Sequence, residues 1–96
     1  MTSDRALLMI ASARMENGEL RRQIIGFIHA ELGVEDDVAP DTPLVTNGLV
    51  DSAGLMRLAA FIEHTTAIRI PDRDVNVGHF DTVRQIEAYL AGRAKA

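Results

Sequence analysis

Apolar residues recur at helical spacing in three segments of the chain, and polar or turn-forming stretches separate them. Such spacing gives each helix one face to bury, so we predict helices over residues 19 to 31 or 32, over Ser52–Thr65, and from Thr82 to about Gly92. Gly33 is the expected stop of the first helix. The apolar positions are Leu20, Ile24, Phe27, Ile28 and Leu32 in the first segment, Leu55, Met56, Leu58, Ala59, Phe61 and Ile62 in the second, and Val83, Ile86, Tyr89 and Leu90 in the third.

The last helix has a defined start. Thr82 and Gln85 have the spacing of a capping box, in which each side chain bonds to the backbone N–H of the other residue. Phe80 or its neighbour is expected to act as a hydrophobic anchor in front of this box.

The segment between the second and last helices is more irregular. Ile68–Ile70 alternates apolar and polar residues like a short strand. Asp72–Gly78 predicts a short helix, with Val75 and Val77 pointing inward.

Residues 34–50 form a long stretch without helical periodicity. Pro40 and Pro43 prevent a helix from continuing through it. Leu44, Leu49 and Val50 are expected to fix this loop onto the core. A loop of this length in a small domain is usually functional or disordered, and its apolar residues favour a functional loop.

A chain of 96 residues is expected to form one domain with a single modest core. Aromatic residues make up 4% of the chain and tryptophan is absent, so the core must be built from Leu, Ile, Val and Ala, as in an all-α, small helical bundle. Little room is left for a substrate cleft. Because the chain has no cysteine, it has no disulfide and no thiolate of its own, and any thiol chemistry needs an added prosthetic group.

The net charge of −4 argues against general binding to nucleic acid. Acidic residues gather before the second helix, with no lysine or arginine among them, whereas residues 52–65 are about neutral. Solvated loop charge and steering of basic partners both explain this run, and both remain open. The acidic residues are Glu35, Asp36, Asp37, Asp41 and Asp51.

The first 16 residues are interpreted as an N-terminal arm or extra helix, and residues 17–96 as the main domain. The apolar run Ala6–Ala11 is too short and lacks the basic start of an export signal, and no segment is long enough to span a membrane. We therefore expect a cytoplasmic protein without a membrane partner.

Asp51 and Ser52 stand at the entry of the second helix, after the turn-forming pair Asn47-Gly48. Either side chain could cap the helix by accepting a free backbone N–H of its first turn. The same N-terminus carries partial positive charge, so it would also tolerate a phosphate esterified to Ser52. Local physical chemistry leaves cap and attachment site as alternatives.

The stretch Thr46–Met56 resembles the phosphopantetheine attachment motif of acyl and peptidyl carrier proteins, and the resemblance extends over roughly residues 19–90. Pro40–Leu44 resembles the loop that precedes the motif in that family, and Ile68–Pro71 and Phe80–Val83 resemble later parts of its sequences. With Pro71, the family pattern makes Ile68–Ile70 an extended linker. The matching motif positions are Gly48, Asp51, Ser52, Leu55, Met56, Leu58 and Ile62.

The resemblance implies a four-helix bundle of acyl-carrier-protein type, with a long loop between helices 1 and 2 and a short third helix. It implies that a phosphopantetheinyl transferase of the holo-carrier-synthase type, using Mg²⁺, attaches 4′-phosphopantetheine from coenzyme A covalently to Ser52, with help from Asp51. The thiol of this arm would carry an acyl or aminoacyl group as a thioester. Such a carrier would be a monomer without enzymatic activity or a metal site of its own.

The implied partners are an adenylating acyl or aminoacyl ligase, or acyltransferase and synthase enzymes. They would dock around the start of the helix that follows Ser52. The implied docking residues are Leu49, Val50, Ala53, Gly54, Leu55, Met56 and Arg57.

Three positions depart from the family pattern. Ala53 stands where a larger apolar residue is common, and Gly54 and Arg57 stand where fatty-acid carriers often have acids. Because like charges across an interface discriminate against partners, a specialised pathway is favoured over primary fatty-acid synthesis. For Gly54, close approach of an enzyme or arm competes with ordinary sequence drift, which is slightly favoured.

Two other functions compete with the carrier. In the first, the bundle is an unmodified adaptor and Ser52 is only a helix cap. In the second, Ser52 is a hydrolase nucleophile, but no base stands at a suitable spacing. The histidines His29, His64 and His79 fall on different predicted elements and have neither metal-ligand nor triad spacing.

Overall fold

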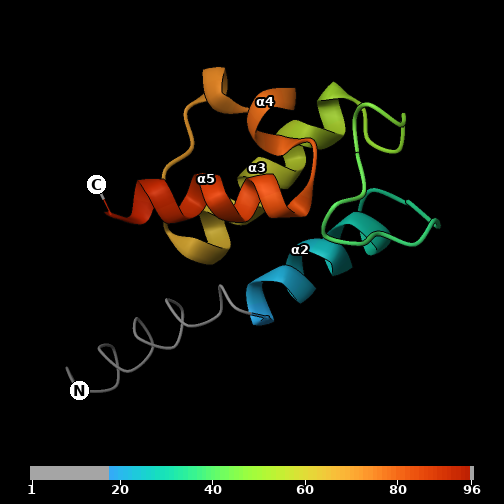
Figure 1. Cartoon of the computed structure of the whole chain (residues 1–96), viewed down its shortest axis with the longest axis horizontal. Coiled ribbons are helices and arrows are strands. Elements are labelled where there is room, and N and C mark those ends of the chain that lie inside the picture. Colours follow the sequence, from blue (N-terminus) through green and yellow to red (C-terminus); the bar gives the residue numbers. More distant parts are fainter. Residues whose placement is uncertain (1–17, 96) are drawn as a thin grey trace.

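The computed structural model describes residues 18–95, so the expected N-terminal arm lies outside the described residues. The described part is helical and contains no strand. Figure 1 shows α5 lying across α3, with α2 beside them and the long loop at one end. The expectation of an all-α, four-helix carrier-type bundle is confirmed. Its elements are α2 (Glu19–Ala30), α3 (Ser52–Thr66), a 3₁₀ turn (Asp72–Asp74), α4 (Val77–Phe80) and α5 (Val83–Lys95).

The apolar face predicted for the first helix is confirmed, although its residues are buried to different degrees. Leu20, Ile24 and Ile28 are buried, whereas Phe27 and Leu32 pack against the core only in part. The ring of Phe27 stacks on that of Phe61 from α3, with 4.5 Å between ring centroids, which joins the two helices at their partly exposed edge. Helix α2 ends at Ala30, slightly earlier than expected.

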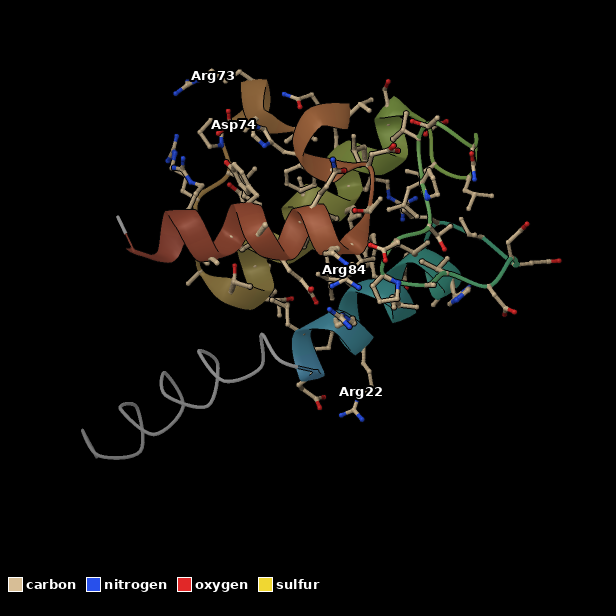
Figure 2. All side chains as sticks on the ribbon, viewed as in Figure 1. Arg22, Arg73, Asp74 and Arg84 are labelled. Atoms are coloured by element: carbon tan, nitrogen blue, oxygen red, sulfur yellow. The ribbon has the colours of Figure 1, made fainter. Side chains whose placement is uncertain are left out.

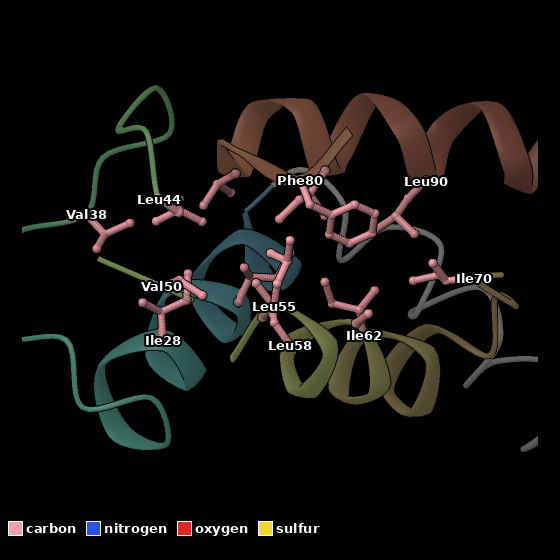
Figure 3. Packing of buried hydrophobic residues seen from close by; sticks show 14 of the residues in the cluster. Ile28, Val38, Leu44, Val50, Leu55, Leu58, Ile62, Ile70, Phe80 and Leu90 are labelled. Atoms are coloured by element: carbon pink, nitrogen blue, oxygen red, sulfur yellow. The ribbon is translucent and has the colours of Figure 1, made fainter. Parts of the chain in front are cut away.

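One apolar cluster holds the bundle together, and Figure 3 shows most of it from close by. Full burial of one Val, Leu, Ile or Phe side chain contributes about 1.5–3 kcal/mol to the stability of the fold. Among the described residues no polar or charged residue is buried; Arg22 and Arg73, for example, extend outward in Figure 2. The buried residues are Leu20, Ile24, Ile28, Val34, Val38, Leu44, Val50, Leu55, Leu58, Ala59, Ile62, Ile70, Phe80, Val83, Ile86 and Leu90.

The predicted short helix over Asp72–Gly78 is wrong in extent. A 3₁₀ turn over Asp72–Asp74 is followed by a separate helix, Val77–Phe80. Asn76 breaks the two apart, because its backbone is extended and its side-chain amide donates to the carbonyl of Arg73 at 2.8 Å.

The inward direction predicted for Val77 is also wrong. This side chain is 46% exposed, and Val75 is only partly buried. The fully buried Phe80, at the end of α4, fills the core position instead.

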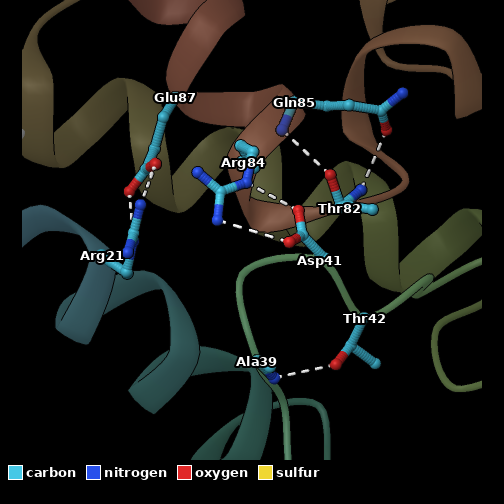
Figure 4. A network of polar contacts seen from close by, with 8 residues as sticks. All are labelled: Arg21, Ala39, Asp41, Thr42, Thr82, Arg84, Gln85 and Glu87. Carbon is cyan, nitrogen blue, oxygen red and sulfur yellow. Dashed lines mark hydrogen bonds and ion pairs between the residues drawn. The ribbon is translucent and has the colours of Figure 1, made fainter.

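The capping box before α5 is confirmed. The backbone N–H of Gln85 donates to Thr82 Oγ1 at 3.0 Å, and Gln85 Oε1 accepts the N–H groups of Thr82 and Asp81, both at 3.0 Å. Figure 4 shows the contacts between Thr82 and Gln85. These bonds satisfy backbone donors that a helix start leaves unpaired, so α5 begins at Val83.

Tyr89 on α5 is only partly buried, in contrast to the prediction. Its hydroxyl needs a polar partner and donates to Asp74 Oδ2 at 2.6 Å, which keeps the ring at the edge of the core. The helix itself runs on to Lys95, beyond the predicted end at Gly92.

Ion pairs join elements that are distant in the sequence. Arg21 of α2 binds Glu87 of α5 through two hydrogen bonds of 2.7 and 2.6 Å, and Arg84 of α5 binds Asp41 of the loop at 2.6 Å (Figure 4).

A hydrogen bond holds the segment after α3. Glu63 Oε2 accepts the backbone N–H of Ile70 at 2.6 Å. This bond fastens the 68–70 segment to α3, and this segment is neither helix nor strand.

Asp81 fastens the long loop to the helices. Its carbonyl accepts the N–H of Leu44 at 2.6 Å, and its Oδ1 accepts those of Val45 and Thr46 at 2.9 and 3.0 Å. Its Oδ2 accepts the Thr46 hydroxyl at 2.7 Å. We call these four bonds the Asp81 clasp. Sequence reasoning missed it, although an acid directly before a capping box is a usable signal.

The apolar residues of the loop complete this attachment. Leu44 and Val50 are buried and Leu49 is partly buried, as predicted. The carbonyl of Leu44 also accepts the N–H groups of Leu49 and Val50, at 2.8 and 3.0 Å. These contacts hold the backbone of residues 44–50, which leads directly to Asp51.

The pKa of Asp81 reflects the clasp. Burial raises the pKa of this carboxyl, but the hydrogen bonds from the Thr46 hydroxyl and from the N–H groups of Thr46 and Val45, together with the nearby N–H of Leu44, lower it below its ordinary value. A carboxyl whose pKa is lower in the folded state stabilises that state when ionised. This stabilisation is present above the pKa of the unfolded chain and is lost as pH falls through the folded-state pKa.

Asp81→Asn tests this dependence. At pH 7 we expect a loss of about 1–2 kcal/mol in unfolding free energy, because hydrogen bonds to a charged acceptor are stronger than those to a neutral amide. The difference from the wild type should shrink as pH falls below the ordinary pKa of aspartate. Urea unfolding across this pH range measures it, with Asp37→Asn on the exposed loop as control. A difference that stays constant with pH would contradict the role of the ionised carboxylate.

Candidate functional site

Asp51 and Ser52 lie where the fixed loop enters α3. Gly48 has a φ of +76°, a conformation that favours glycine, and its N–H donates to the carbonyl of Val45 at 2.9 Å in a tight turn. Val50 then enters the core at 3% exposure. The turn and the buried valine together set the position of the next two residues.

Asp51 caps α3, and Ser52 does not. The backbone of Asp51 is extended, its Oδ1 accepts the N–H of Gly54 at 2.7 Å, and its carbonyl accepts that of Leu55 at 2.9 Å. Ser52 is the first residue of the helix and is exposed, and its hydroxyl makes no hydrogen bond among the described residues. The interpretation of Ser52 as a cap is therefore wrong for this structure.

A side chain at Gly54 would be crowded, which supports a packing role for this glycine beside the alternative of sequence drift. The residue is buried, and a Cβ atom placed there would lie 3.1 Å from Val50 Cγ1 and 3.2 Å from Asp51 Oδ1. Both distances are shorter than ordinary van der Waals contact. The cap and the buried valine thus come close to the helix backbone because no side chain stands between them.

A groove opens beside Ser52. It holds about 360 Å³ and lies between the segment after α2, the end of the loop and the first turns of α3. No residue of α4 or α5 lines it. The lining residues are Leu32, Gly48, Leu49, Val50, Asp51, Ala53, Gly54 and Arg57.

The predicted docking residues divide into two groups. Val50, Gly54 and Leu55 are buried, so their side chains offer no surface to a partner. Leu49 is partly buried, whereas Ala53, Met56 and Arg57 are exposed, Met56 by 41%.

Arg57 carries the positive charge of this exposed face. Its guanidinium lies 3.8 Å from Glu31 at the end of α2, and both side chains are more than half exposed. Exposed ion pairs of this kind contribute only about 0–1 kcal/mol. The pair leaves most of the hydrogen-bonding capacity of Arg57 to other acceptors.

The acidic run before α3 has mixed roles. Asp51 is the helix cap, and Asp41 binds Arg84, whose hydrogen bond lowers the pKa of Asp41 despite an opposing effect of desolvation. The remaining acids, Glu35, Asp36 and Asp37, are exposed on the loop. The two explanations given for the acidic run, solvated loop charge and steering of basic partners, therefore apply only to these three residues.

The histidines do not form a catalytic group with Ser52. His29 Nδ1 lies 2.7 Å from the carbonyl of Val34, the ring of His79 lies 5.0 Å from that of Tyr89, and no described hydrogen bond joins Ser52 to a histidine. Within residues 18–95 no cluster of three or more His, Cys, Asp or Glu side chains could hold a metal ion.

Comparison with known proteins agrees with this fold and site. Residues 22–90 match the family described as phosphopantetheine attachment site, and this chain belongs to that family. Comparisons with curated proteins and with solved structures gave no match. Family members carry 4′-phosphopantetheine covalently and work with phosphopantetheinyl transferases and with synthase or ligase enzymes. No helix in the described part of this chain is long and apolar enough to cross a membrane.

The division of roles between Asp51 and Ser52 predicts that substituting Asp51 lowers stability more than substituting Ser52. Asp51→Ala should lower the unfolding free energy by about 0.5–2 kcal/mol through loss of the cap, and Asp51→Asn should recover most of it. Ser52→Ala should change it by less than about 0.5 kcal/mol, because an exposed hydroxyl without a partner is removed. Thermal and urea unfolding measure all three variants. A larger loss for Ser52→Ala than for Asp51→Ala would contradict the assignment of the cap.

Proposed function

We propose that Ser52 is the attachment residue for 4′-phosphopantetheine and that residues 17–96 form the domain of a free-standing acyl or aminoacyl carrier protein. The observation that carries this proposal is an exposed serine at the first position of α3, with its cap supplied by the neighbouring residue, within the segment that matches the family. The serine hydroxyl is accessible and has no structural task.

The surroundings of Ser52 suit a phosphodiester. The N–H groups of Ser52 and Ala53 have no acceptor among the described residues, since the cap takes the N–H of Gly54 and the carbonyl of Asp51 takes that of Leu55. These donors and the positive end of α3 favour an anion by about 0.3–1 kcal/mol. A phosphate on Ser52 Oγ is therefore attracted by this helix start.

In the modification step the Ser52 hydroxyl attacks the pyrophosphate of coenzyme A within a transferase that supplies Mg²⁺. Ser52 Oγ gains a bond to the phosphorus on the pantetheine side, its proton is lost, and the adenosine bisphosphate departs. Asp51 holds the first turn of the helix in place, and the Asp81 clasp holds the loop in front of it. The bound arm supplies a thiol that carries an acyl group as a thioester.

Tethering gives the carrier its function. A group held on a short flexible arm is presented to an enzyme docked on the same protein at an effective concentration in the millimolar range. The chain itself needs no catalytic group for this task, and we propose that it is not an enzyme. It acts as a cytoplasmic monomer.

A specialised pathway fits the exposed face better than primary fatty-acid synthesis. Among the predicted docking positions, the exposed and partly exposed residues are apolar or basic, namely Leu49, Ala53, Met56 and Arg57. Enzymes with basic docking surfaces would meet Arg57 as a like charge. We propose an adenylating acyl or aminoacyl ligase, or a polyketide-like synthase, as the partner.

The mass of the intact protein tests the carrier. Incubation with coenzyme A, Mg²⁺ and a promiscuous phosphopantetheinyl transferase should add one phosphopantetheine to the wild type and to Ser12→Ala, and none to Ser52→Ala. Unfolding curves establish that Ser52→Ala is folded. Absence of any gain in the folded wild type with several transferases would overturn the proposal and favour an unmodified adaptor.

Arg57→Glu tests the choice of partner. Removing the like charge should raise kcat/KM of a fatty-acid synthesis enzyme for the loaded carrier by roughly fivefold, equivalent to about 1 kcal/mol of interfacial charge interaction. Arg22→Glu, an exposed arginine on α2, serves as the control. Equal kcat/KM values for wild type and Arg57→Glu would contradict the role assigned to Arg57.

A further inference from the structure

The groove beside Ser52 has no role in the attachment step itself. It starts next to the serine, with Asp51 and Ala53 among its lining residues, and includes Arg57 further along α3. Arg57 stands five positions after Ser52 in the helix, a rise of about 7.5 Å along the axis. The groove therefore leads from the proposed attachment point to a cation.

The size and walls of the groove suit a small flexible ligand. Its volume of about 360 Å³ lies in the range of small-molecule sites, roughly 300–1,000 Å³. Leu32 and Leu49 supply apolar surface, and both are only partly covered by the core.

Gly54 keeps the groove open. A Cβ atom at this position would lie 3.6 Å from Leu32 Cδ2, as well as close to Val50 and Asp51, and would occupy part of the space between the two walls. Arg57 adds N–H donors at the groove, and its described ion pair with Glu31 is long and exposed. The guanidinium can therefore turn to another acceptor at little cost.

The pantetheine part of the arm has matching chemistry. It alternates an apolar dimethyl-substituted carbon with a hydroxyl and two amides, so it offers both a surface for leucine side chains and carbonyl acceptors for an arginine. It is also tethered to the groove's entrance, which favours binding without a high affinity of its own.

We propose that this groove is a docking site for the pantetheine arm, in which Leu32 and Leu49 contact the dimethyl group and Arg57 donates to an amide carbonyl. The inference rests on the proposed function, because the arm must be attached at Ser52 to reach the groove in this way. The site is formed by Leu32 after α2, the end of the loop and α3, and none of its lining residues comes from α4 or α5. Docking there holds the arm against its own carrier between encounters with partners.

Nuclear magnetic resonance on isotopically labelled apo protein and on the same protein carrying an unlabelled arm tests the site. We expect arm-dependent chemical-shift changes at Leu32, Leu49 and the Arg57 side chain, and nuclear Overhauser effects from the arm's methyl groups to the leucine methyl groups. Arg57→Ala should reduce the shift changes at both leucines by roughly twofold to fivefold, since it removes one hydrogen bond. Arg22→Ala, which removes an exposed arginine of α2 that does not line the groove, should leave them unchanged.

The intact mass of each sample separates the two possible failures. A sample that carries the arm but shows changes only at residues 51–53, or at Val77 and His79 on α4, would overturn the docking site and leave the carrier function in place. A folded protein that gains no arm would overturn the carrier function and the docking site together. Equal effects of Arg57→Ala and Arg22→Ala would remove Arg57 from the site.

Discussion

The carboxylate of Asp81 joins the end of the long loop to the helical part of this protein. The core sets how α2, α3 and α5 pack, but apolar contacts have no direction, and by themselves they do not fix the path of a long loop. Two carboxylate oxygens and one carbonyl of Asp81 bind three consecutive loop residues, Leu44 to Thr46. Because the same residue adjoins the capping box of α5, the loop and the helix start share one anchor. The position of Ser52 depends on that anchor through Leu44, Val50 and Asp51.

Neighbouring residues at the entry of α3 have separate tasks. Asp51 satisfies the helix start, Gly54 allows the backbone to come close to the cap and to Val50, and Ser52 takes part in neither contact. A serine that also capped the helix would have its oxygen engaged by a backbone N–H, and its modification would remove a stabilising bond. The arrangement in this protein leaves the helix cap to Asp51 and the proposed attachment to Ser52, so the two tasks fall on adjacent positions.

The features that could be predicted from the sequence are those encoded over a few residues. The stripe of α2, the extent of α3, the Thr82–Gln85 box and the inward residues Leu44 and Val50 follow from spacing, turn chemistry and hydrophobicity. What could not be predicted depends on contacts between distant segments. The clasp joins Asp81 to residues 35 and 36 positions away, and the hydroxyl of Tyr89 meets Asp74. The choice of Asp51 over Ser52 as the cap is local, yet both side chains suit that role, so only the geometry of the loop decides between them.

The long span of the clasp bears on the order in which this protein folds. Helix α3 can form from its own residues, whereas the bonds of the clasp close only after α5 has begun to take its place, because loop closure over dozens of residues carries an entropy cost that local contacts avoid. During synthesis Ser52 leaves the ribosome well before Asp81 does. A nascent chain that ends between them therefore contains the complete motif without its mature conformation. The loop in front of Ser52, the proposed attachment residue, therefore reaches its final path only after the chain as far as Asp81 has been made.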